Sequence, residues 1–287
     1  HYGTTMVTTT YLEQGVGMSV ASRTSTTQQS YTIAQITDTH LMATAQGSFV
    51  KMNPEQSFQA VLDHIFQLYP QVDAIVHTGD LAQEAVPETY QRYIEKMQHY
   101  QIPFFQIPGN HDLLSAFPLP EGQQFPYCVE YGTWCFILLN TAVPEHVDGL
   151  LDSAQLEQLD VLLQQHQQQH VIICGHHHPF DMNSTWIDQH KLKNTEALMA
   201  VLCKHDHIKL MLCGHVHQES QRTEQNIPCF SCPSTCVQFK PLSHDFALDT
   251  VHPGFRILHL HADGRFETQV HRLIDAPCEI NTEISGY

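Results

Sequence analysis

Residues 106–112 read Gln-Ile-Pro-Gly-Asn-His-Asp, and the interpretation of the fold starts from this stretch. The largely apolar run at 102–107 stops at Pro108-Gly109, which is a typical change from a strand to a loop. The three residues that follow, 110–112, offer an amide oxygen, an imidazole and a carboxylate. Pro, Gly, Asn and Asp are also the commonest turn residues, so the stretch by itself fits an ordinary turn equally well.

Four other predicted strands end in polar clusters of the same kind. Strands are expected at 31–37, 72–78, 104–107, 170–174 and 208–213, and their ends are Asp38-Thr39-His40, Gly79-Asp80, Gly109-Asn110-His111-Asp112, Gly175-His176-His177-His178 and Gly214-His215-Val216-His217. Apolar positions at helical spacing predict helices over 54–69 and 86–100, between the first three strands. This alternation predicts parallel, buried strands with right-handed crossovers, whose carboxyl ends share one edge.

The rest of the chain predicts a hairpin, two more helices and several late strands. The hairpin spans 127–140, the helices span 153–165 and 195–204 with Ser153 and Asn194 as caps, and the strands span 220–224, 228–231, 256–261 and 266–270. Residues 1–30 are rich in Thr, Ser and Gln and have no basic start or apolar core, so we expect a flexible lead-in and no secretory signal. Residues 31–287 are then expected to form one domain.

The composition indicates an acidic globular protein. Hydrophobic residues make up 42% and charged residues 15% of the 287 residues, which is typical of a folded chain with a sizeable core. The formal net charge of −17 supplies no basic track, so we expect no nucleic-acid partner. No apolar run approaches the roughly 20 residues of a membrane-spanning helix, so no membrane association is expected. No feature points to an obligate protein partner.

The nine cysteines are expected to be free thiols. Their odd number, without the framework of a small disulfide-rich domain, favours a reducing cytoplasm as the location. Cys229, Cys232 and Cys236 lie close together in the sequence. A structural zinc site needs four ligands in recognisable pairs, so we do not predict one there.

The five strand ends carry the ligands of a metal centre. Carboxylates, amide oxygens and imidazoles suit Mn²⁺, Fe²⁺, Co²⁺ and Zn²⁺. In the pairs Asp38/His40 and His215/His217, both side chains can leave the same side of an extended segment. The set exceeds what one tetrahedral ion needs, and it suits two ions about 3.5–4 Å apart that clamp a phosphoryl group. Asp80, alone after its glycine and central in the set, could bridge both ions.

In order and residue type, the five strand ends resemble the signature of calcineurin-like metallophosphoesterases, from about residue 33 to the C-terminus. Four further stretches resemble the bacterial class III 3′,5′-cyclic-AMP phosphodiesterases of that superfamily: Trp186-Ile-Asp-Gln-His190, Leu212-Cys-Gly-His215, Ser234-Thr-Cys-Val-Gln-Phe-Lys-Pro241 and Leu260-His-Ala-Asp-Gly264. The resemblance implies an α/β fold, a two-sheet αββα sandwich with the metal site at the carboxyl ends of its strands.

The resemblance also implies a set of metal ligands. Asp38, His40, Asp80 and His217 are expected to hold one ion, and Asp80, Asn110, His177 and His215 the other. His177 is chosen because the family ligand usually lies two residues before a proline, here Pro179; His176 and His178 are the alternatives. The two ions are expected to be divalent or mixed-valence, with Fe and Mn favoured and Zn or Co as alternatives.

The activity implied by the resemblance is hydrolysis of 3′,5′-cyclic AMP to 5′-AMP by a metal-activated water. His111 is expected to contact the phosphate and to act as the general acid, with Asp112 as a candidate to orient it. The expected substrate-contacting residues are His40, Asp80, Asn110, His111 and His217. One alternative is another phosphoester substrate: a phosphomonoester, a 2′,3′-cyclic nucleotide or a nucleotide-linked substrate. A second, less favoured alternative is a non-catalytic scaffold, because such proteins lose metal ligands and here no ligand position is lost.

Other histidines and one tryptophan also have the chemistry of site residues. His205 and His207 copy the alternating pattern, but they lie in a polar junction and are expected in a solvated turn. His259 and His261 alternate along a late strand and are expected to share one of its faces. Trp186 and the segment 234–241 could line a nucleotide pocket, since an aromatic face suits adenine, but ordinary loop packing fits Trp186 equally well.

Overall fold

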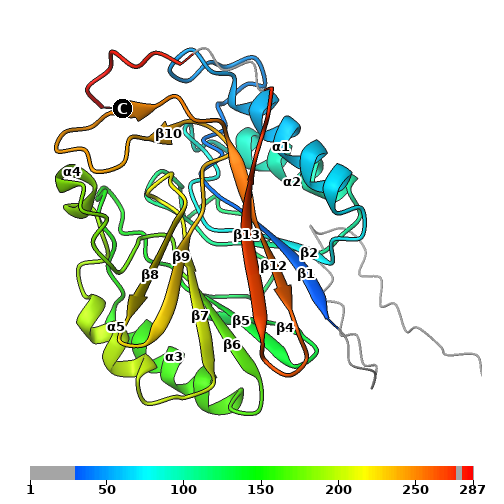
Figure 1. Ribbon diagram of the computed structural model, residues 1–287, viewed down its shortest axis with the longest axis vertical. Helices are drawn as coiled ribbons and strands as arrows, with labels where there is room; N and C mark the ends of the chain where they lie inside the picture. Colours follow the sequence, from blue (N-terminus) through cyan, green and yellow to red (C-terminus); the bar gives the residue numbers. More distant parts are fainter. Residues whose placement is uncertain (1–29, 276–279, 287) are drawn as a thin grey trace, which may run out of the picture.

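Two β-sheets pack face to face in the computed structural model, and helices cover the outer side of each sheet (Figure 1). The structure describes residues 30–275 and 280–286, so the lead-in predicted for 1–30 lies outside the described residues apart from Ser30. The elements in chain order are β1 (Tyr31–Ile36), α1 (Pro54–Leu68), β2 (Ala74–His77), α2 (Pro87–His99), β3 (Phe104–Gln106), β4 (Tyr127–Tyr131), β5 (Trp134–Leu138), α3 (Ser153–Gln165), β6 (His170–Cys174), α4 (Thr185–Asp188), α5 (Thr195–Leu202), β7 (Ile208–Cys213), β8 (Ser220–Glu224), β9 (Ile227–Ser231), β10 (Gln238–Phe239), β11 (Leu248–Asp249), β12 (Gly254–Leu260) and β13 (Phe266–Arg272).

The two sheets divide the predicted parallel strands between them. The first sheet has the order β13-β12-β1-β2-β3, in which β1, β2 and β3 are parallel and β12-β13 is an antiparallel hairpin. The second has the order β4-β5-β6-β7-β9-β8, in which β5, β6, β7 and β9 are parallel. The parallel arrangement is confirmed, and it spans two sheets.

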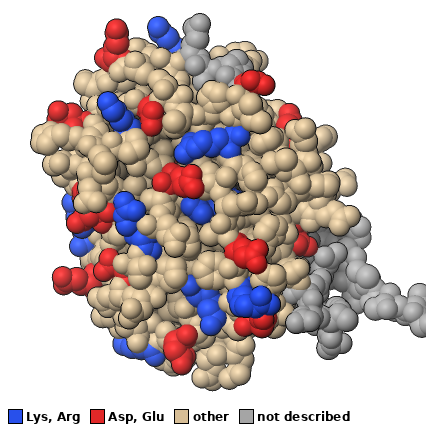
Figure 2. All heavy atoms as spheres, viewed as in Figure 1, with Lys and Arg blue, Asp and Glu red and all other residues tan. Residues whose placement is uncertain are grey.

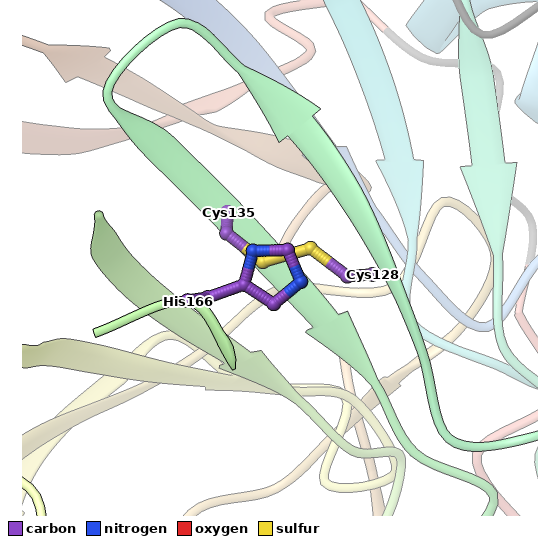
Figure 3. A group of neighbouring side chains, drawn as sticks. All are labelled: Cys128, Cys135 and His166. Atoms are coloured by element: carbon purple, nitrogen blue, oxygen red, sulfur yellow. A yellow bond between two sulfur atoms is a disulfide. The ribbon is translucent and has the colours of Figure 1, made fainter. Parts of the chain in front are cut away.

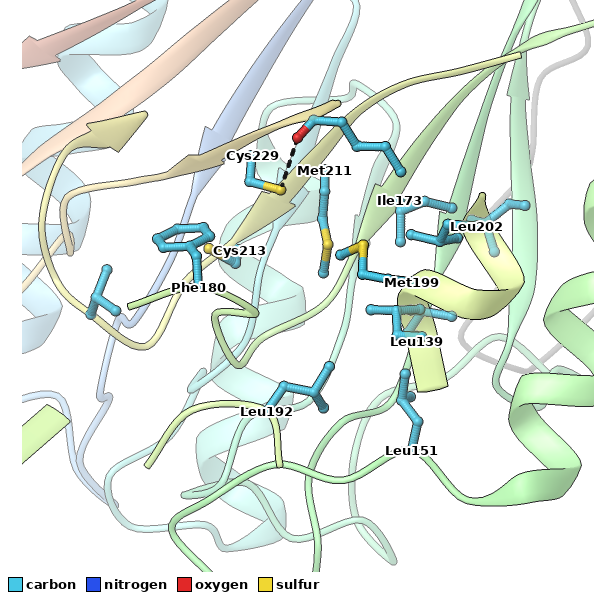
Figure 4. Packing of buried hydrophobic residues seen from close by; sticks show 14 of the residues in the cluster. Leu139, Leu151, Ile173, Phe180, Leu192, Met199, Leu202, Met211, Cys213 and Cys229 are labelled. Atoms are coloured by element: carbon cyan, nitrogen blue, oxygen red, sulfur yellow. Dashed lines mark hydrogen bonds between the residues drawn. The ribbon is translucent and has the colours of Figure 1, made fainter. Parts of the chain in front are cut away.

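Alternating residues along the strands separate three hydrophobic cores. Ile33 and Ile172 face the core between the sheets, whereas their chain neighbours Ala34 and Ile173 face the outer cores. Ala34 packs in the cluster that contains residues of α1 and α2, and Ile173 in the one that contains residues of α3 and α5 (Figure 4). Strands buried on both faces read as continuous apolar runs. The αββα sandwich implied by the resemblance is therefore confirmed.

The helices α1, α3 and α5 start where the sequence predicts, but two of the expected capping contacts differ. Asn53 caps α1, where its side-chain oxygen accepts a hydrogen bond from Gln56 N at 2.9 Å. The cap of α3 is Asp152 and not Ser153, because the Asp152 carboxylate accepts from the amide of Gln155. Asn194 also makes no cap bond to α5; its amide group binds the backbone of Leu151 instead. The short elements α4, β10 and β11 were not predicted, because two to four residues carry too little periodicity.

The prediction that all nine cysteines are free thiols is wrong for one pair. Cys128 on β4 and Cys135 on β5 form a disulfide across the hairpin. Cys229, Cys232 and Cys236 are buried free thiols, and in the described part of the chain they form no group with metal-binding geometry. The disulfide was not visible in the cysteine spacing.

The surface charge and the character of the helices can be compared with the expected absence of nucleic-acid and membrane partners. On the face shown in Figure 2, Lys and Arg side chains are interspersed with Asp and Glu, and no continuous basic track crosses that face. Among the described residues, no helix combines the length and the apolar character that a membrane span requires.

Candidate metal centre

The ends of five strands, three from one sheet and two from the other, meet at one edge of the sandwich. Backbone and side chains join the two sheets there: the amide of His215 donates to Asp38 Oδ2 at 3.1 Å, and His176 Nδ1 donates to the carbonyl of Thr78 at 2.7 Å. Deeper in, the buried Gln35 side chain on β1 donates to the carbonyl of Cys213 at the end of β7. The predicted clusters therefore converge, although they come from different sheets.

Five of the predicted ligands have a left-handed backbone. Their φ angles are 53° for Asp38, 46° for His40, 54° for Asp80, 68° for His215 and 47° for His217. Positive φ is uncommon in residues other than glycine, and it persists where the surroundings enforce it, as at functional sites. Each of these strands thus ends in a sharp turn that redirects the polar residue into the shared edge.

Asp38, His40 and His217 form the first group, with ligand atoms within 4.8 Å of one another. His217 Nε2 lies 3.1 Å from Asp38 Oδ1 and 3.2 Å from His40 Nε2. The other ring nitrogens are held from outside, because His40 Nδ1 donates to Gln83 Oε1 and His217 Nδ1 to the carbonyl of Val237. Such outer hydrogen bonds fix the tautomer and aim Nε2 at a metal.

Asp80 lies between the first group and the second. Its Oδ2 atom is 3.8 Å from His40 Nε2 and 3.3 Å from His176 Nε2, while Oδ1 accepts from the amide of His111 at 2.9 Å. Asp80 also belongs to two of the groups with metal-binding geometry, one with His40 and His111 and one with Asp38 and His176. This is the position that a bridging carboxylate requires.

Several buried polar atoms of the centre have no hydrogen-bond partner within the described structure: Asp38 Oδ1, Asn110 Oδ1, His176 Nε2 and His215 Nε2. Buried polar atoms are nearly always paired, and an unpaired one often marks a bound ion. These four belong to different strand ends and include oxygen and nitrogen donors. The donor set therefore fits metal ions of the borderline class.

The His176-His177-His178 triplet divides its roles by ring orientation. His176 Nδ1 is held by Thr78, and its Nε2 faces Asp80. Both ring nitrogens of His177 are engaged elsewhere, Nδ1 with Thr141 Oγ1 at 2.7 Å and Nε2 with the carbonyl of Val147 at 3.0 Å. His176, His177 and His215 form a group with metal-binding geometry. Within it, His176 directs Nε2 at Asp80, whereas both ring nitrogens of the predicted ligand His177 contact groups outside the centre.

The third histidine of the triplet lies toward a neighbouring loop. His178 Nε2 is 3.5 Å from Asp188 Oδ1, at the end of α4. Nothing in the spacing of three consecutive histidines distinguishes their ring directions, which depend on partners contributed by other strands. The sequence could therefore define the triplet but not the ligand within it.

The buried carboxylates of the centre favour a bound positive charge. Burial alone would lower the pKa of His176, but the Asp80 and Asp38 carboxylates outweigh burial and raise that pKa to about 9. His40 behaves differently, since burial lowers its pKa to about 3 and keeps it neutral. Bound metal ions would supply the positive charge that a proton on His176 otherwise provides.

Comparison with known proteins identifies the family. The model of the calcineurin-like phosphoesterases matches residues 31–219. The chain belongs to this family. It is 39% identical to the 3′,5′-cyclic adenosine monophosphate phosphodiesterase CpdA of Vibrio vulnificus, over 91% of this chain and 96% of that protein. It is 40% identical to the protein of the same name from Escherichia coli K12, over 89% and 94%. The superfamily resemblance is thus confirmed.

Solved structures show the same fold at low sequence identity. A dimetal phosphatase from Danio rerio has a TM-score of 0.56 at 16% identity, covering 84% of this chain and 98% of that one. GAP50, described as the anchor in the inner membrane complex of Plasmodium, has a TM-score of 0.57 at 14% identity, covering 89% and 90%. The phosphoesterase fold is therefore shared, and these two neighbours show the fold alone.

In this phosphoesterase, Asp112 fastens the loop that carries His111. Its carboxylate accepts from the amides of Gly109 at 2.9 Å and Leu81 at 3.1 Å and from the Tyr90 hydroxyl at 3.0 Å. Asp112, the candidate to orient His111, thus acts on the backbone of the loop that carries this histidine. The His111 ring lies beside the centre, 5.0 Å from the ring of His40 between centroids.

A cavity of about 300 Å³ adjoins the centre. Asp80, Asn110, His111, His215 and His217 line its polar side, and Val147, Trp186, Ile187, His190, Phe239, Phe246, Ser285 and Gly286 complete the wall. Trp186 packs edge-on against Phe239 and Phe246, with ring centroids 4.9 and 5.0 Å apart. Trp186 thus lines the cavity and also packs against the neighbouring core, so both features expected of it from the sequence are present.

The two histidine pairs that the sequence analysis did not assign to the site lie outside the metal centre. His205 Nε2 is 2.7 Å from Asp160 Oδ1, which joins a helix end to α3. His259 Nδ1 is 3.1 Å from Thr32 Oγ1, across the β1–β12 pairing. Both contacts are structural: His205 lies at the predicted junction between a helix and a strand, and His259 lies on the late strand β12.

Proposed function

We propose that this chain is a metal-dependent phosphodiesterase that hydrolyses 3′,5′-cyclic AMP to 5′-AMP. The observation that carries the proposal is the convergence of unpartnered buried donors beside a cavity with an aromatic wall. The two CpdA relatives, whose names state this activity, support the substrate. A cyanobacterial relative from Nostoc, 38% identical, is named a 3′,5′-cyclic-nucleotide phosphodiesterase.

The proposed ligands form two sets that share one carboxylate. Asp38, His40, Asp80 and His217 would hold one ion, and Asp80, Asn110, His176 and His215 the other. Two such ions supply Lewis-acid charge and lower the pKa of water, which makes a nucleophile available near neutral pH. Fe and Mn are the proposed metals, with Zn and Co as alternatives, because this donor set accepts all of them.

The chain's own residues then divide the remaining work. His111 lines the cavity on the first-sheet side, and we assign it the proton that the leaving 3′-oxygen needs. Asp112 holds the backbone of its loop in place. Phe239 also lines the cavity and stacks on the ring of His217 with centroids 3.9 Å apart. Trp186 offers an aromatic surface for the adenine base.

The other expectations are part of the same proposal. We assign the catalytic unit to residues 31–287 and the location to the cytoplasm, with no nucleic-acid, membrane or obligate protein partner. The rival functions are hydrolysis of another phosphoester and a docking role. The docking role is disfavoured because every ligand position holds a residue able to bind metal.

A comparison of substrates tests the proposal. One metal-loaded preparation is assayed with 3′,5′-cyclic AMP, 2′,3′-cyclic AMP and p-nitrophenyl phosphate. We expect the highest kcat/KM for 3′,5′-cyclic AMP. Negligible turnover of that ester, together with fast turnover of either rival, would show that the proposed substrate is wrong while the proposed metal centre stands. Metal content well below one equivalent after reconstitution would favour the docking role.

A further inference from the structure

A separate group of side chains with metal-binding geometry lies where the β4–β5 hairpin meets the end of α3. Cys128 is on β4, Cys135 is on β5, and His166 directly follows α3 (Figure 3). Both sulfur atoms and one ring nitrogen of His166 lie within 4.8 Å of one another. None of these residues belongs to the metal centre described above, and the proposed function does not use them.

The strand register explains why the two sulfurs meet. Glu130 pairs with Cys135, and Cys128 pairs with Ile137, so the hairpin is antiparallel. Residues two apart on a strand share a face, which places Cys128, Glu130 and Cys135 on one side of the hairpin. Cys135 is fully buried in the outer core under α3, and Cys128 packs against that core.

The end of α3 brings His166 onto the same side. His166 is the C-cap residue, and its amide donates to the carbonyl of Leu162. Its Nδ1 atom is 2.6 Å from Gln169 Oε1 and 3.3 Å from Glu130 Oε1. Outer contacts of this kind orient a ligating imidazole and leave its Nε2 atom for the metal.

The disulfide is one of two chemical states of this cysteine pair. An external thiol reductant breaks the sulfur–sulfur bond by exchange: two thiols are oxidised to one disulfide, and Cys128 and Cys135 each gain an electron and a proton. A metal ion that then binds displaces those protons, since thiolates are the ligands. The cytoplasm proposed above is a reducing compartment, where the dithiol form prevails.

We propose that, in the dithiol form, Cys128, Cys135 and His166 bind a thiophilic metal ion such as Zn²⁺, and that the metal and the disulfide exclude each other. Two thiolates and one imidazole are three ligands of the type that zinc takes in proteins. Water completes the tetrahedron at the surface side, where Glu130 is half exposed. Because the proposed dinuclear centre contains no cysteine, the two sites differ in their chemistry.

Cobalt titration separates the two sites. Co²⁺ replaces Zn²⁺, and a thiolate ligand gives it a near-ultraviolet charge-transfer absorption that oxygen and nitrogen ligands lack. The reduced protein, with its free thiols counted by alkylation and mass spectrometry, is titrated with Co²⁺ beside the disulfide form. We expect one more equivalent in the reduced protein than in the disulfide form, together with the thiolate absorption.

Variants assign the absorption to residues. Cys128→Ser and the double variant Cys128→Ser/Cys135→Ser should abolish it, and His166→Gln should weaken Co²⁺ binding more than tenfold. Cys203→Ser is the matched control, because Cys203 is an exposed thiol elsewhere on the surface, and it should change nothing. Phosphodiesterase activity of the cysteine variants should stay near that of the unmodified chain, so this test is independent of the proposed function.

Three results would overturn the proposal. The first is a reduced, folded protein that shows no thiolate absorption. The second is an absorption that survives in the double serine variant. The third is a disulfide that can be reduced only when the protein unfolds, with unfolding measured by circular dichroism. The pair would then be a permanent cross-link. Because Cys128 is only partly buried, Cys128→Ser remains informative if Cys135→Ser fails to fold.

Discussion

His176 Nε2 lies 3.3 Å from Asp80 Oδ2, and the opposite nitrogen of the same ring donates to the carbonyl of Thr78 at 2.7 Å. His176 follows β6 of the second sheet, whereas Asp80 and Thr78 follow β2 of the first. One imidazole thus connects both sheets at the middle of the centre, and its orientation is set by a backbone carbonyl.

His176→Ala and His177→Ala are expected to behave differently. His176→Ala removes an inward nitrogen and should lose about one of two ions per chain, with activity lower by about 10²–10⁴-fold if several kcal/mol of charge stabilisation disappear. His177→Ala is the matched control, since both of its nitrogens bind protein groups, and it should keep both ions. Metal analysis by mass spectrometry is the measurement. The reverse pattern would restore His177 as the ligand.

Asp80→Ala should disrupt both metal positions together. Its carboxylate lies between His40 and His176 and also fixes the amide of His111, so no neighbouring group replaces it. We expect little metal and little activity. Asp181→Ala is a suitable control, because that carboxylate is exposed and pairs with Lys191 at the surface. An Asp80→Ala protein that still holds one full equivalent of metal would show that the carboxylate does not bridge.

His111→Ala should leave the metal content nearly intact and slow turnover. Loss of a proton donor costs about 10²–10⁴-fold in kcat. The cost should depend on the leaving group: large for 3′,5′-cyclic AMP, whose 3′-oxygen leaves as an alkoxide, and small for bis(p-nitrophenyl) phosphate. Equal losses on both substrates would argue against proton donation, and loss of one ion would make His111 a ligand.

Trp186→Ala should weaken nucleotide binding and spare the metal centre. Stacking of a base on an aromatic ring contributes about 1–3 kcal/mol, so we expect KM for 3′,5′-cyclic AMP to rise about 5- to 150-fold. Trp186→Phe, which keeps an aromatic face against Phe239 and Phe246, should recover most of this loss. Inhibition by inorganic phosphate, which has no base, should be unchanged. A parallel loss of phosphate inhibition would indicate a collapsed loop.

The sequence predicted the strands and their polar ends because both signals are local. An apolar run that stops at a glycine and a ligand, as at Gly79-Asp80, needs no knowledge of the rest of the chain. The division of these strands between two sheets was not predictable in this way, since β1–β3 and β6–β7 meet through long-range contacts such as His215 to Asp38.

The directions of the imidazole rings and the partners of single side chains could not be predicted from the sequence either. The choice within the histidine triplet depends on Thr78 and Thr141, which lie far from it in the sequence. Asp112 binds the backbone of its own loop and of residues 81 and 82, which spacing alone does not reveal. The Cys128–Cys135 pair depends on the hairpin register, and the odd cysteine count had suggested free thiols instead.

The proposed dinuclear phosphodiesterase centre is tested most directly by titrating the metal-free protein with Mn²⁺ while 5′-AMP formation from 3′,5′-cyclic AMP is followed. Mn²⁺ prefers oxygen and nitrogen ligands, so it reports on the dinuclear centre and not on the thiols. We expect activity to rise to a plateau at two equivalents per chain, with 5′-AMP as the product. A plateau at one equivalent, a 3′-AMP product or no turnover at any Mn²⁺ concentration would contradict it.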